Sequence, residues 1–382
     1  MLKSLVDYIS LLYRSRIIFS VKPKNIVIFD CVNSYELSKI LDNDKFIIIS
    51  SRKEKIYKLY FTKNIILFVI TNLFKRKLKL NYMIALIKEI NPEIVITNID
   101  NSVEFSLLAK FFYKKIDFIA VQAANRGDIF GNYGNVNKTF FLPILICFSK
   151  FDIQLFKKKK INVKKYLIAG SLKNSVFKLE NKSKNISKIK YDICFISKNL
   201  WDFTPNIKSP PYENITKILI FLAKYAKAYN KKIVVQSKGV KNFKELNVYK
   251  QIFKGTAVKI LWRQNIKYNS YKSISKSSLI LGGPSTLLRE AYYFNKKVLC
   301  CDLFESVNIN SHPFRGINYI ANFNYSKFEK RLNVLFKLNF QSYLKRLQKP
   351  KNFYMSDINT AQFIKTLTRN IIENNRKTIK TI

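Results

Sequence analysis

The chain contains 382 residues, 48% of them hydrophobic, which suits two packed domains and excludes a largely disordered chain. Lys and Arg number 69 against 24 Asp and Glu, a formal net charge of +45. One histidine and five cysteines, with no Cys-x-x-Cys pair, argue against a zinc site and are typical of a reducing compartment. No uninterrupted apolar run reaches the ~18 residues of a membrane-spanning helix.

The excess of positive charge has two interpretations. Lys, Asn, Ile, Phe and Tyr are abundant together, which indicates a genome rich in A and T and would raise the Lys content without selection for binding. Attraction to anions is the other interpretation, and lipid headgroups, nucleotide phosphates and acidic glycans are its candidates. Lys far outnumbers Arg, whereas specific base readout relies on Arg, so specific nucleic-acid binding is not expected.

Residues 1–20 combine apolar side chains at helical spacing with a basic end, which predicts an amphipathic helix. Two roles stay open for this helix, packing on the first domain or lying on a membrane surface. The segment lacks the small-residue cleavage site of a signal peptide.

Short apolar runs alternate with helical patterns through the first half of the chain. Such runs are typical of parallel strands that are covered on both faces. Helices are predicted between them, for example over Asn81–Ile90 and Val103–Tyr113. The runs that predict strands are Asn25–Phe29, Phe46–Ser50, Glu93–Thr97, Asp117–Gln122 and Ile144–Phe148.

The pattern breaks over residues 172–190, a polar stretch rich in Lys, Asn and Ser that predicts a linker. The alternation then restarts, with a helical apolar stripe over Pro211–Tyr229. Strands are predicted at Tyr191–Ser197, Lys232–Gln236, Val258–Trp262, Ser278–Gly282 and Val298–Asp302. We expect a first domain at residues 1–171, the linker, a second domain at 191–322 and C-terminal helices at 323–382.

The alternation in both halves predicts an α/β fold with two Rossmann-like domains, whose mostly parallel sheets face each other across a cleft. Ligands of such sheets bind at the carboxyl ends of the strands. Residues that follow strands are therefore the first candidates for a functional site.

The strongest local pattern is a predicted strand that runs into a Gly-rich turn and then a helix. Glycine lets the backbone turn sharply and approach a ligand, and Ser285 can cap a helix whose first N–H groups face an anion. Glu290 lies further along the same helix, within reach of ribose or sugar hydroxyls. The alternative is an ordinary strand–turn–helix with a capping serine. The candidate donor-binding residues of this segment are Gly282, Gly283, Ser285, Thr286 and Glu290.

This segment resembles the donor-binding element of GT-B glycosyltransferases and of the related sugar-nucleotide 2-epimerases. Those proteins carry a Gly/Ser-rich turn, a helix that holds Glu-Ala, and a Gly-Lys-Pro-Val-like entry to the next strand. The matching positions here are Gly283, Ser285, Thr286, Glu290, Ala291 and Asn295–Val298, with Asn295 where the family has Gly. The resemblance implies a GT-B-like fold that uses nucleotide-activated sugars.

Three short pieces of the first half resemble bacterial surface carbohydrate biosynthesis proteins. They are Asn98–Asn101 with Phe105, Phe118–Gln122 leading to Arg126–Asp128, and Ala169–Asn174. The family carries Gln-Asn-Gly where this chain has Gln122-Ala123-Ala124. This resemblance implies a role in building surface carbohydrate.

Polar residues that follow two predicted strands of the first domain converge on one crevice. Asp100 or Asp128 is a candidate general base on an acceptor hydroxyl, and Arg126 can pair with a phosphate or an acidic sugar. Asn101 and Gln122 are further acceptor-side candidates. The alternatives are that Asp100 and Asn101 cap the helix beginning near Ser102, and that Asp128 is a solvated loop residue.

Three residues of the second domain are weaker candidates. Lys198 and Arg263 follow strands and can meet a diphosphate, or they can be ordinary surface cations. His312 can be a base, although a base usually lies in the first domain of such folds.

We therefore expect a cytoplasmic, metal-independent glycosyltransferase without a cofactor. It would pass a sugar from a nucleotide-activated donor to a surface polysaccharide or lipid-linked acceptor, with an anionic membrane surface at the inner face as a further partner. A sugar-nucleotide epimerase on the same fold and a non-catalytic basic binding protein in polysaccharide assembly are the alternatives.

Overall fold

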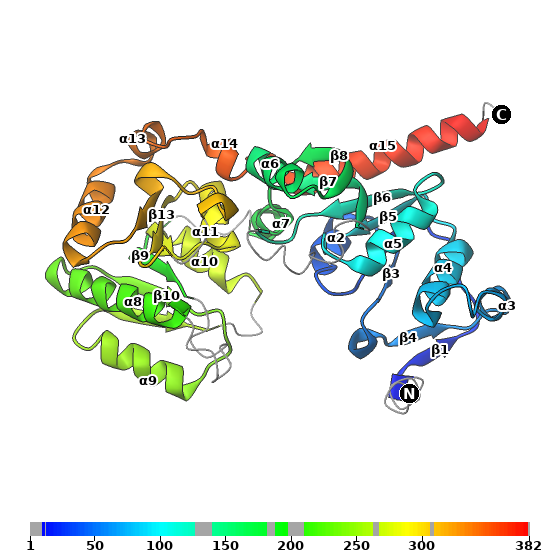
Figure 1. Cartoon of the computed structure of the whole chain (residues 1–382), viewed down its shortest axis with the longest axis horizontal. Helices are drawn as coiled ribbons and strands as arrows, with labels where there is room; N and C mark the ends of the chain where they lie inside the picture. The colour runs from blue at the N-terminus through cyan, green and yellow to red at the C-terminus, as the bar shows by residue number, and fades with distance from the viewer. Residues whose placement is uncertain are drawn as a thin grey trace.

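The computed structural model describes residues 10–11, 13–126, 140–181, 188–197, 210–262, 267–305 and 309–380. They form two α/β domains side by side along the long axis of the molecule (Figure 1). Each domain is built on a six-stranded sheet in which every neighbouring pair of strands is parallel. The predicted α/β class and the two Rossmann-like halves are confirmed.

The first sheet contains the five strands predicted from the first half of the sequence and one further strand. In order across the sheet these are β3 (Phe46–Ile49), β2 (Ile26–Phe29), β5 (Ile94–Thr97), β6 (Asp117–Val121), β7 (Phe141–Cys147) and β8 (Asn162–Ile168). The helices of this half are α2 (Tyr35–Ile40), α3 (Lys63–Thr71), α4 (Leu78–Ile90), α5 (Val103–Phe112), α6 (Lys150–Lys158) and α7 (Leu172–Glu180).

The second sheet likewise adds one strand to the predicted five. Its order is β11 (Val258–Leu261), β10 (Ile233–Gln236), β9 (Tyr191–Ile196), β12 (Ser277–Gly282), β13 (Lys297–Asp302) and β14 (Tyr319–Ala321). The helices are α8 (Pro210–Ala228), α9 (Phe243–Ile252), α10 (Asn269–Ser275), α11 (Thr286–Glu290), α12 (Tyr325–Lys337), α13 (Phe340–Lys345), α14 (Lys351–Tyr354) and α15 (Thr360–Lys380). Short 3-10 helices lie at Lys53–Lys55, Ala291–Phe294, Ile309–Ser311 and Gly316–Asn318.

Strand β2 shows why the strand sequences are continuously apolar. Side chains alternate between the two faces of a strand. Val27 and Phe29 belong to the core beneath α4 and α5, whereas Ile26 and Ile28 belong to the core on the opposite face. All four side chains are buried, because helices cover both faces of the sheet.

The chain crosses between the domains and then returns. Residues 172–180 of the expected linker form α7, and Leu172 and Val176 are buried against the first sheet. At the far end of the chain, α15 lies along the first domain (Figure 1) and adds Ile364 to the same core. Gly170 allows this return, since it has a φ of +84° and an added Cβ would lie 2.7 Å from the Ser356 carbonyl oxygen.

A small two-stranded parallel sheet lies at the outer end of the first domain. It pairs β1 (Arg16–Ile18) with β4 (Lys58–Tyr60), and sequence patterns predicted neither strand. Of residues 1–20, which were expected to form an amphipathic helix, residues 10, 11, 13 and 14 are helical, whereas Arg16–Ile18 form β1, so that part of the prediction is wrong. Within the described part of the chain, no helix is both long and apolar enough to span a bilayer.

Candidate functional site

Each sheet reverses its strand order next to its first strand, and ligands of parallel sheets bind at such switch points. In the first sheet the switch point lies between β2 and β5, and in the second between β9 and β12. We call the edge at which the strands of a sheet end its carboxyl edge. The candidate residues are described in turn along these two edges.

Asp100, Asn101 and Arg126 come together at the carboxyl edge of the first sheet, as predicted. The Arg126 Nε donates to Asp100 Oδ2 over 2.8 Å, and its Nη2 donates to the other Asp100 oxygen and, over 3.2 Å, to Asn101 Oδ1. The Asp100 side chain is fully buried, whereas 15% of the Arg126 side chain is exposed. The pair therefore presents its cationic member to solvent.

The capping alternative for Asp100 and Asn101 is wrong. The N-cap of α5 is Ser102, whose hydroxyl accepts from the Phe105 N–H over 3.3 Å. Asp100 instead accepts from the Ala123 N–H over 3.1 Å, in addition to Arg126. These hydrogen bonds of Asp100 thus connect the loop after β6 to the loop after β5.

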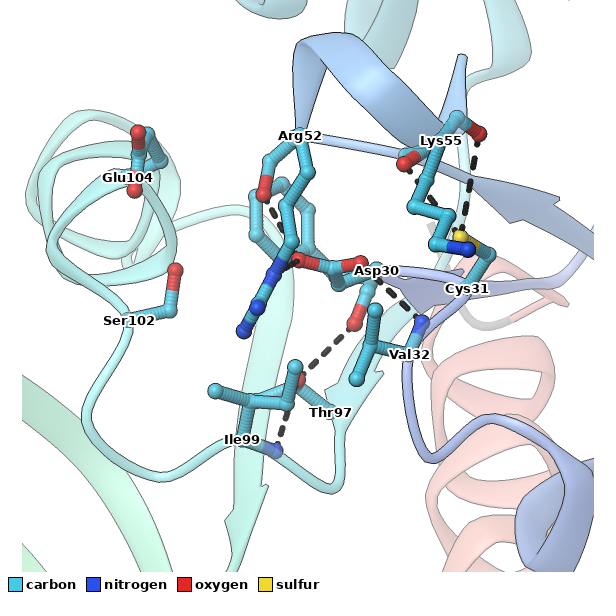
Figure 2. Close-up of polar contacts among 12 residues, drawn as sticks. Asp30, Cys31, Val32, Arg52, Lys55, Thr97, Ile99, Ser102 and Glu104 are labelled. Carbon is cyan, nitrogen blue, oxygen red and sulfur yellow. Dashed lines mark hydrogen bonds and ion pairs between the residues drawn. The ribbon is translucent and has the colours of Figure 1, made fainter. Parts of the chain in front are cut away.

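A second ion pair lies at the switch point itself, and sequence reasoning did not assign it. Figure 2 shows the Asp30 carboxylate between Arg52 and the backbone of Val32. Asp30 Oδ2 accepts from Ser51 Oγ over 2.8 Å and from Arg52 Nε over 3.2 Å. The signal visible in the sequence is that Asp30 directly follows an apolar strand. In the structure its φ is 71°, which is uncommon for a residue other than Gly.

Gln122 is buried, and its side-chain amide forms hydrogen bonds that hold the loop after β6 in place. Its Nε2 donates to Ala124 O over 3.0 Å and to Asp152 Oδ1 over 2.9 Å. Its Oε1 accepts from the Phe148 N–H over 3.0 Å. Both ends of the Gln122 amide are hydrogen-bonded to protein groups. In this arrangement any acceptor-side role of Gln122 would therefore be indirect, by positioning the loop.

The Gly-rich turn lies at the switch point of the second sheet. An added Cβ on Gly282 would lie 2.8 Å from the carbonyl oxygen of Ile196, so glycine is needed for β12 to pass β9 this closely. Ser285 caps α11, with its hydroxyl accepting from the Leu288 N–H over 3.2 Å, as predicted. Residues 283–287, which include Gly283, are half-buried.

The first domain contacts this turn directly. Thr286 Oγ1 accepts from the Asn125 N–H over 2.8 Å, and Asn125 precedes Arg126 in the loop after β6. The candidate donor-side turn is thus hydrogen-bonded, across the domain boundary, to the residue that precedes the candidate acceptor-side arginine.

Glu290 is buried between the domains. Ser171 Oγ, from the start of α7, donates to one carboxylate oxygen over 2.5 Å, and Tyr271 Oη of α10 donates to the other over 3.0 Å. Burial raises the pKa of the Glu290 carboxyl, while the hydrogen bond from Ser171 opposes this shift. A ribose hydroxyl that reached this carboxylate would have to replace Ser171 or Tyr271.

Arg289, the residue before Glu290, forms an ion pair that joins the domains. It donates to both oxygens of Asp152 of α6, over 2.8 and 2.6 Å, and both side chains are fully buried. The guanidinium also donates to Asn125 Oδ1, Ser149 Oγ and the carbonyl oxygen of Tyr354. Every side of this cation is thus matched by an acceptor.

His312 is fully buried, and neither ring nitrogen has a hydrogen-bond partner among the described residues. Burial lowers the pKa of its imidazole to about 4, and the Arg315 charge contributes in the same direction. The ring lies against Phe314 and Tyr319, with centroid distances of 5.6 and 5.2 Å. A neutral imidazole without contact to solvent is a poor general base as it stands.

Asp128, Lys198 and Arg263 lie outside the described residues. The described residues contain no group of three or more His, Cys, Asp or Glu side chains able to hold a metal ion.

No family model and no curated protein sequence matches the chain. Several solved structures are similar to the chain. A UDP-GlcNAc 2-epimerase from Neisseria meningitidis, bound to UDP-GlcNAc, is similar at 15% identity over 91% of this chain and 99% of its own, with a TM-score of 0.56. MnaA of S. aureus with UDP is 16% identical over 89% of this chain and 95% of its own, with a TM-score of 0.54.

The wall teichoic acid polymerase TagF is also similar, at 12% identity over 93% of this chain and 90% of that chain, with a TM-score of 0.53. This chain therefore has the GT-B fold that these epimerases and TagF share. At these identities the similarity establishes the fold.

Proposed function

We propose that this chain is a nucleotide-sugar-using enzyme that transfers a sugar to a surface polysaccharide or lipid-linked acceptor. The observation that carries the proposal is the contact between Thr286 and Asn125, which brings the turn at the switch point of the second sheet against the loop after β6 of the first sheet. Donor and acceptor ends of one cleft are thereby within reach of each other.

The donor side of the proposal is the turn Gly282–Thr286. The first N–H groups of a helix have no acceptor within the helix, and they favour an anion such as a diphosphate. The half-buried turn supports close approach of the phosphates to the backbone. Such stabilisation of a leaving diphosphate requires no metal ion.

The acceptor side is the pair of Asp100 and Arg126. Arg126 is part-exposed and can bind a phosphate or an acidic sugar of the acceptor. Asp100 can accept the proton of an acceptor hydroxyl once that hydroxyl replaces one of the Arg126 hydrogen bonds. Glu290 belongs to the donor side, where its bond from Ser171 joins the two domains and a donor hydroxyl that reached it would replace Ser171 or Tyr271.

Epimerisation of a nucleotide-sugar is the second candidate. The similarity to a 2-epimerase over 99% of that protein's chain supports it. An epimerase needs no acceptor, and it changes the sugar without releasing the nucleotide. The products of the two reactions therefore distinguish transfer from epimerisation.

The first test is binding. We expect one of UDP, CDP, GDP, CMP or UMP to raise the melting temperature of the protein, because a ligand that binds only the folded state stabilises it. Gly283→Val, which adds a branched side chain to the turn, should abolish this shift. Glu329→Gln on the outer helix α12 is the matched control and should keep it. If no nucleotide shifts the melting temperature at millimolar concentration, the proposal is wrong.

The second test separates the reactions. With the nucleotide-sugar that binds, transfer predicts nucleotide release only when an acceptor glycan or lipid is added, and Arg126→Met should slow release without weakening nucleotide binding. Epimerisation predicts a new sugar-nucleotide signal by NMR with no acceptor present. Nucleotide binding with neither product would indicate a non-catalytic binding protein in polysaccharide assembly.

A further inference from the structure

Helix α3 and the turn after it expose large apolar side chains at the outer end of the first domain. Phe74 is 99% exposed, Ile70 65% and Leu67 58%, although residues of this kind usually lie inside a protein. We call this surface the α3 patch. Its members are Ile66, Leu67, Ile70, Leu73, Phe74 and Leu78.

The patch is not needed for the core, because α3 has a separate inner face. Ile65 is 1% exposed, and Phe68 and Val69 pack partly against the core of the first sheet. A helix at the surface of a domain normally carries polar residues on its outer side. Here the outer side is also apolar, which is unexpected for a surface that remains in water.

The flanks of the patch are basic. Lys63, Lys75, Arg76 and Lys77 are exposed, and the sequence contains no Asp or Glu between Glu54 and Glu89. Cations also lie against aromatic rings beside the helix. Lys88 Nζ is 4.4 Å from the ring centre of Phe68, and the Arg76 guanidinium is 5.1 Å from that of Phe111.

The patch lies away from the cleft. Figure 1 places α3 at the end of the first domain opposite the second domain, close to β1 and β4. The small sheet adds further exposed apolar residues on this end of the domain, namely Ile17, Phe19 and Tyr57. Burial of this end would therefore leave the boundary between the two domains uncovered.

We propose that the α3 patch docks on an anionic lipid surface, with its apolar side chains in the headgroup region and its Lys and Arg side chains on the phosphates. An apolar face flanked by Lys and Arg is typical of helices that lie in the membrane interface. A protein partner fits less well, because Lys is depleted in protein interfaces and the charged residues of this flank are mostly Lys and Arg, with Glu89 as an acidic side chain that contacts α3 through Asn64. The inference does not depend on the reaction that the cleft catalyses.

The test is co-sedimentation of the full chain with vesicles. We expect binding to vesicles of phosphatidylglycerol and phosphatidylethanolamine, and at least tenfold weaker binding to phosphatidylcholine alone. The triple variant Leu67→Ser, Ile70→Ser, Phe74→Ser should bind the anionic vesicles at least tenfold more weakly than wild type. A matched control exists in the second domain, where Val240 and Phe243 are 74% and 73% exposed, and Val240→Ser, Phe243→Ser should bind as wild type does.

Insertion is tested separately from electrostatic adsorption. The emission of Phe74→Trp should shift to the blue on addition of anionic vesicles, whereas that of Phe243→Trp should not. If the triple variant, folded by circular dichroism, binds vesicles as tightly as wild type, the net charge alone explains binding and the proposal is overturned. If wild type forms a concentration-dependent dimer that the triple variant loses, and neither binds vesicles, the patch docks a second copy of the chain and the proposal is also overturned.

Discussion

Two Arg–Asp pairs lie close together in the loop network between the domains, and they differ in exposure. Arg289 and Asp152 are both fully buried and join one domain to the other. Arg126 and Asp100 belong to one domain, and the arginine keeps 15% of its side chain exposed. The same chemistry therefore occurs in two settings: the enclosed pair joins the two domains, and the open pair leaves part of its arginine exposed.

A third pair extends this comparison. Arg52 is 45% exposed while its partner Asp30 is 2% exposed, at the switch point of the first sheet. Across the three pairs the carboxylate stays buried and the arginine becomes steadily more exposed. The cost of breaking a pair should fall in the same order, because an exposed guanidinium recovers its hydration and a buried one cannot.

The largest effect is expected for Asp152→Ala. It leaves Arg289 buried without a counter-ion, and loss of one partner of a buried pair costs about 3–5 kcal/mol. Urea denaturation followed by circular dichroism measures the loss. The double variant Asp152→Leu, Arg289→Met should regain most of the stability, since apolar replacements of both partners are often tolerated. A loss below ~1 kcal/mol for Asp152→Ala would contradict the assignment.

His312 tests a buried group whose ring nitrogens have no hydrogen-bond partner in the part of the chain that the structure describes. Its pKa is lowered from 6.5 to about 4, so its contribution to stability is present above pH 6.5 and is lost as the pH falls towards 4. The full contribution is about 3–4 kcal/mol, because one pKa unit corresponds to about 1.36 kcal/mol. The unfolding free energy of His312→Phe should fall less than that of wild type between pH 7.5 and pH 5. NMR of the single histidine gives the pKa directly, and a value near 6.5 would refute the prediction.

Asp100→Asn tests the open pair. We expect a moderate stability loss of about 1–2 kcal/mol, because Arg126 is part-exposed and can rehydrate. Under the proposed function the turnover should fall by about 100-fold or more while nucleotide affinity stays unchanged. A fall of less than tenfold would show that Asp100 only holds the loop.

Arg52→Met should have the smallest effect on stability, below ~1 kcal/mol, because exposed ion pairs contribute little. Asp30 keeps its hydrogen bonds from Ser51 and from the Val32 N–H in this variant. Thermal denaturation of Arg52→Met and of Asp152→Ala compares the most exposed pair with the most buried one. Equal losses of stability in the two variants would show that the exposure of the arginine does not determine the stability cost of breaking the pair.

The sequence predicted the parts of the molecule that depend on local patterns. All ten predicted strands formed, because a continuous apolar run between turns has few other structures available in a sheet covered on both faces. The meeting of Asp100, Asn101 and Arg126 followed from the same reasoning, since neighbouring parallel strands end at one edge.

The pairings across the domains were not predictable in this way. Arg289 and Asp152 are separated by 137 positions, and nothing in either local pattern specifies the other. Glu290 was placed on the correct helix, but its partners Ser171 and Tyr271 come from other elements. Such contacts depend on how two finished domains pack, which the period of a strand or helix does not encode.

The return of α15 to the first domain has a consequence for how the chain is made. Ile364 and Ala361 complete the core that contains Ile26 and Ile28, so the first domain encloses this core only when α15 is present. During synthesis the N-terminal half emerges from the ribosome long before α15 does. Until α15 has been made, part of one face of the first sheet is uncovered and accessible to chaperones and to other nascent chains, and a fragment that stops before α15 should aggregate rather than fold.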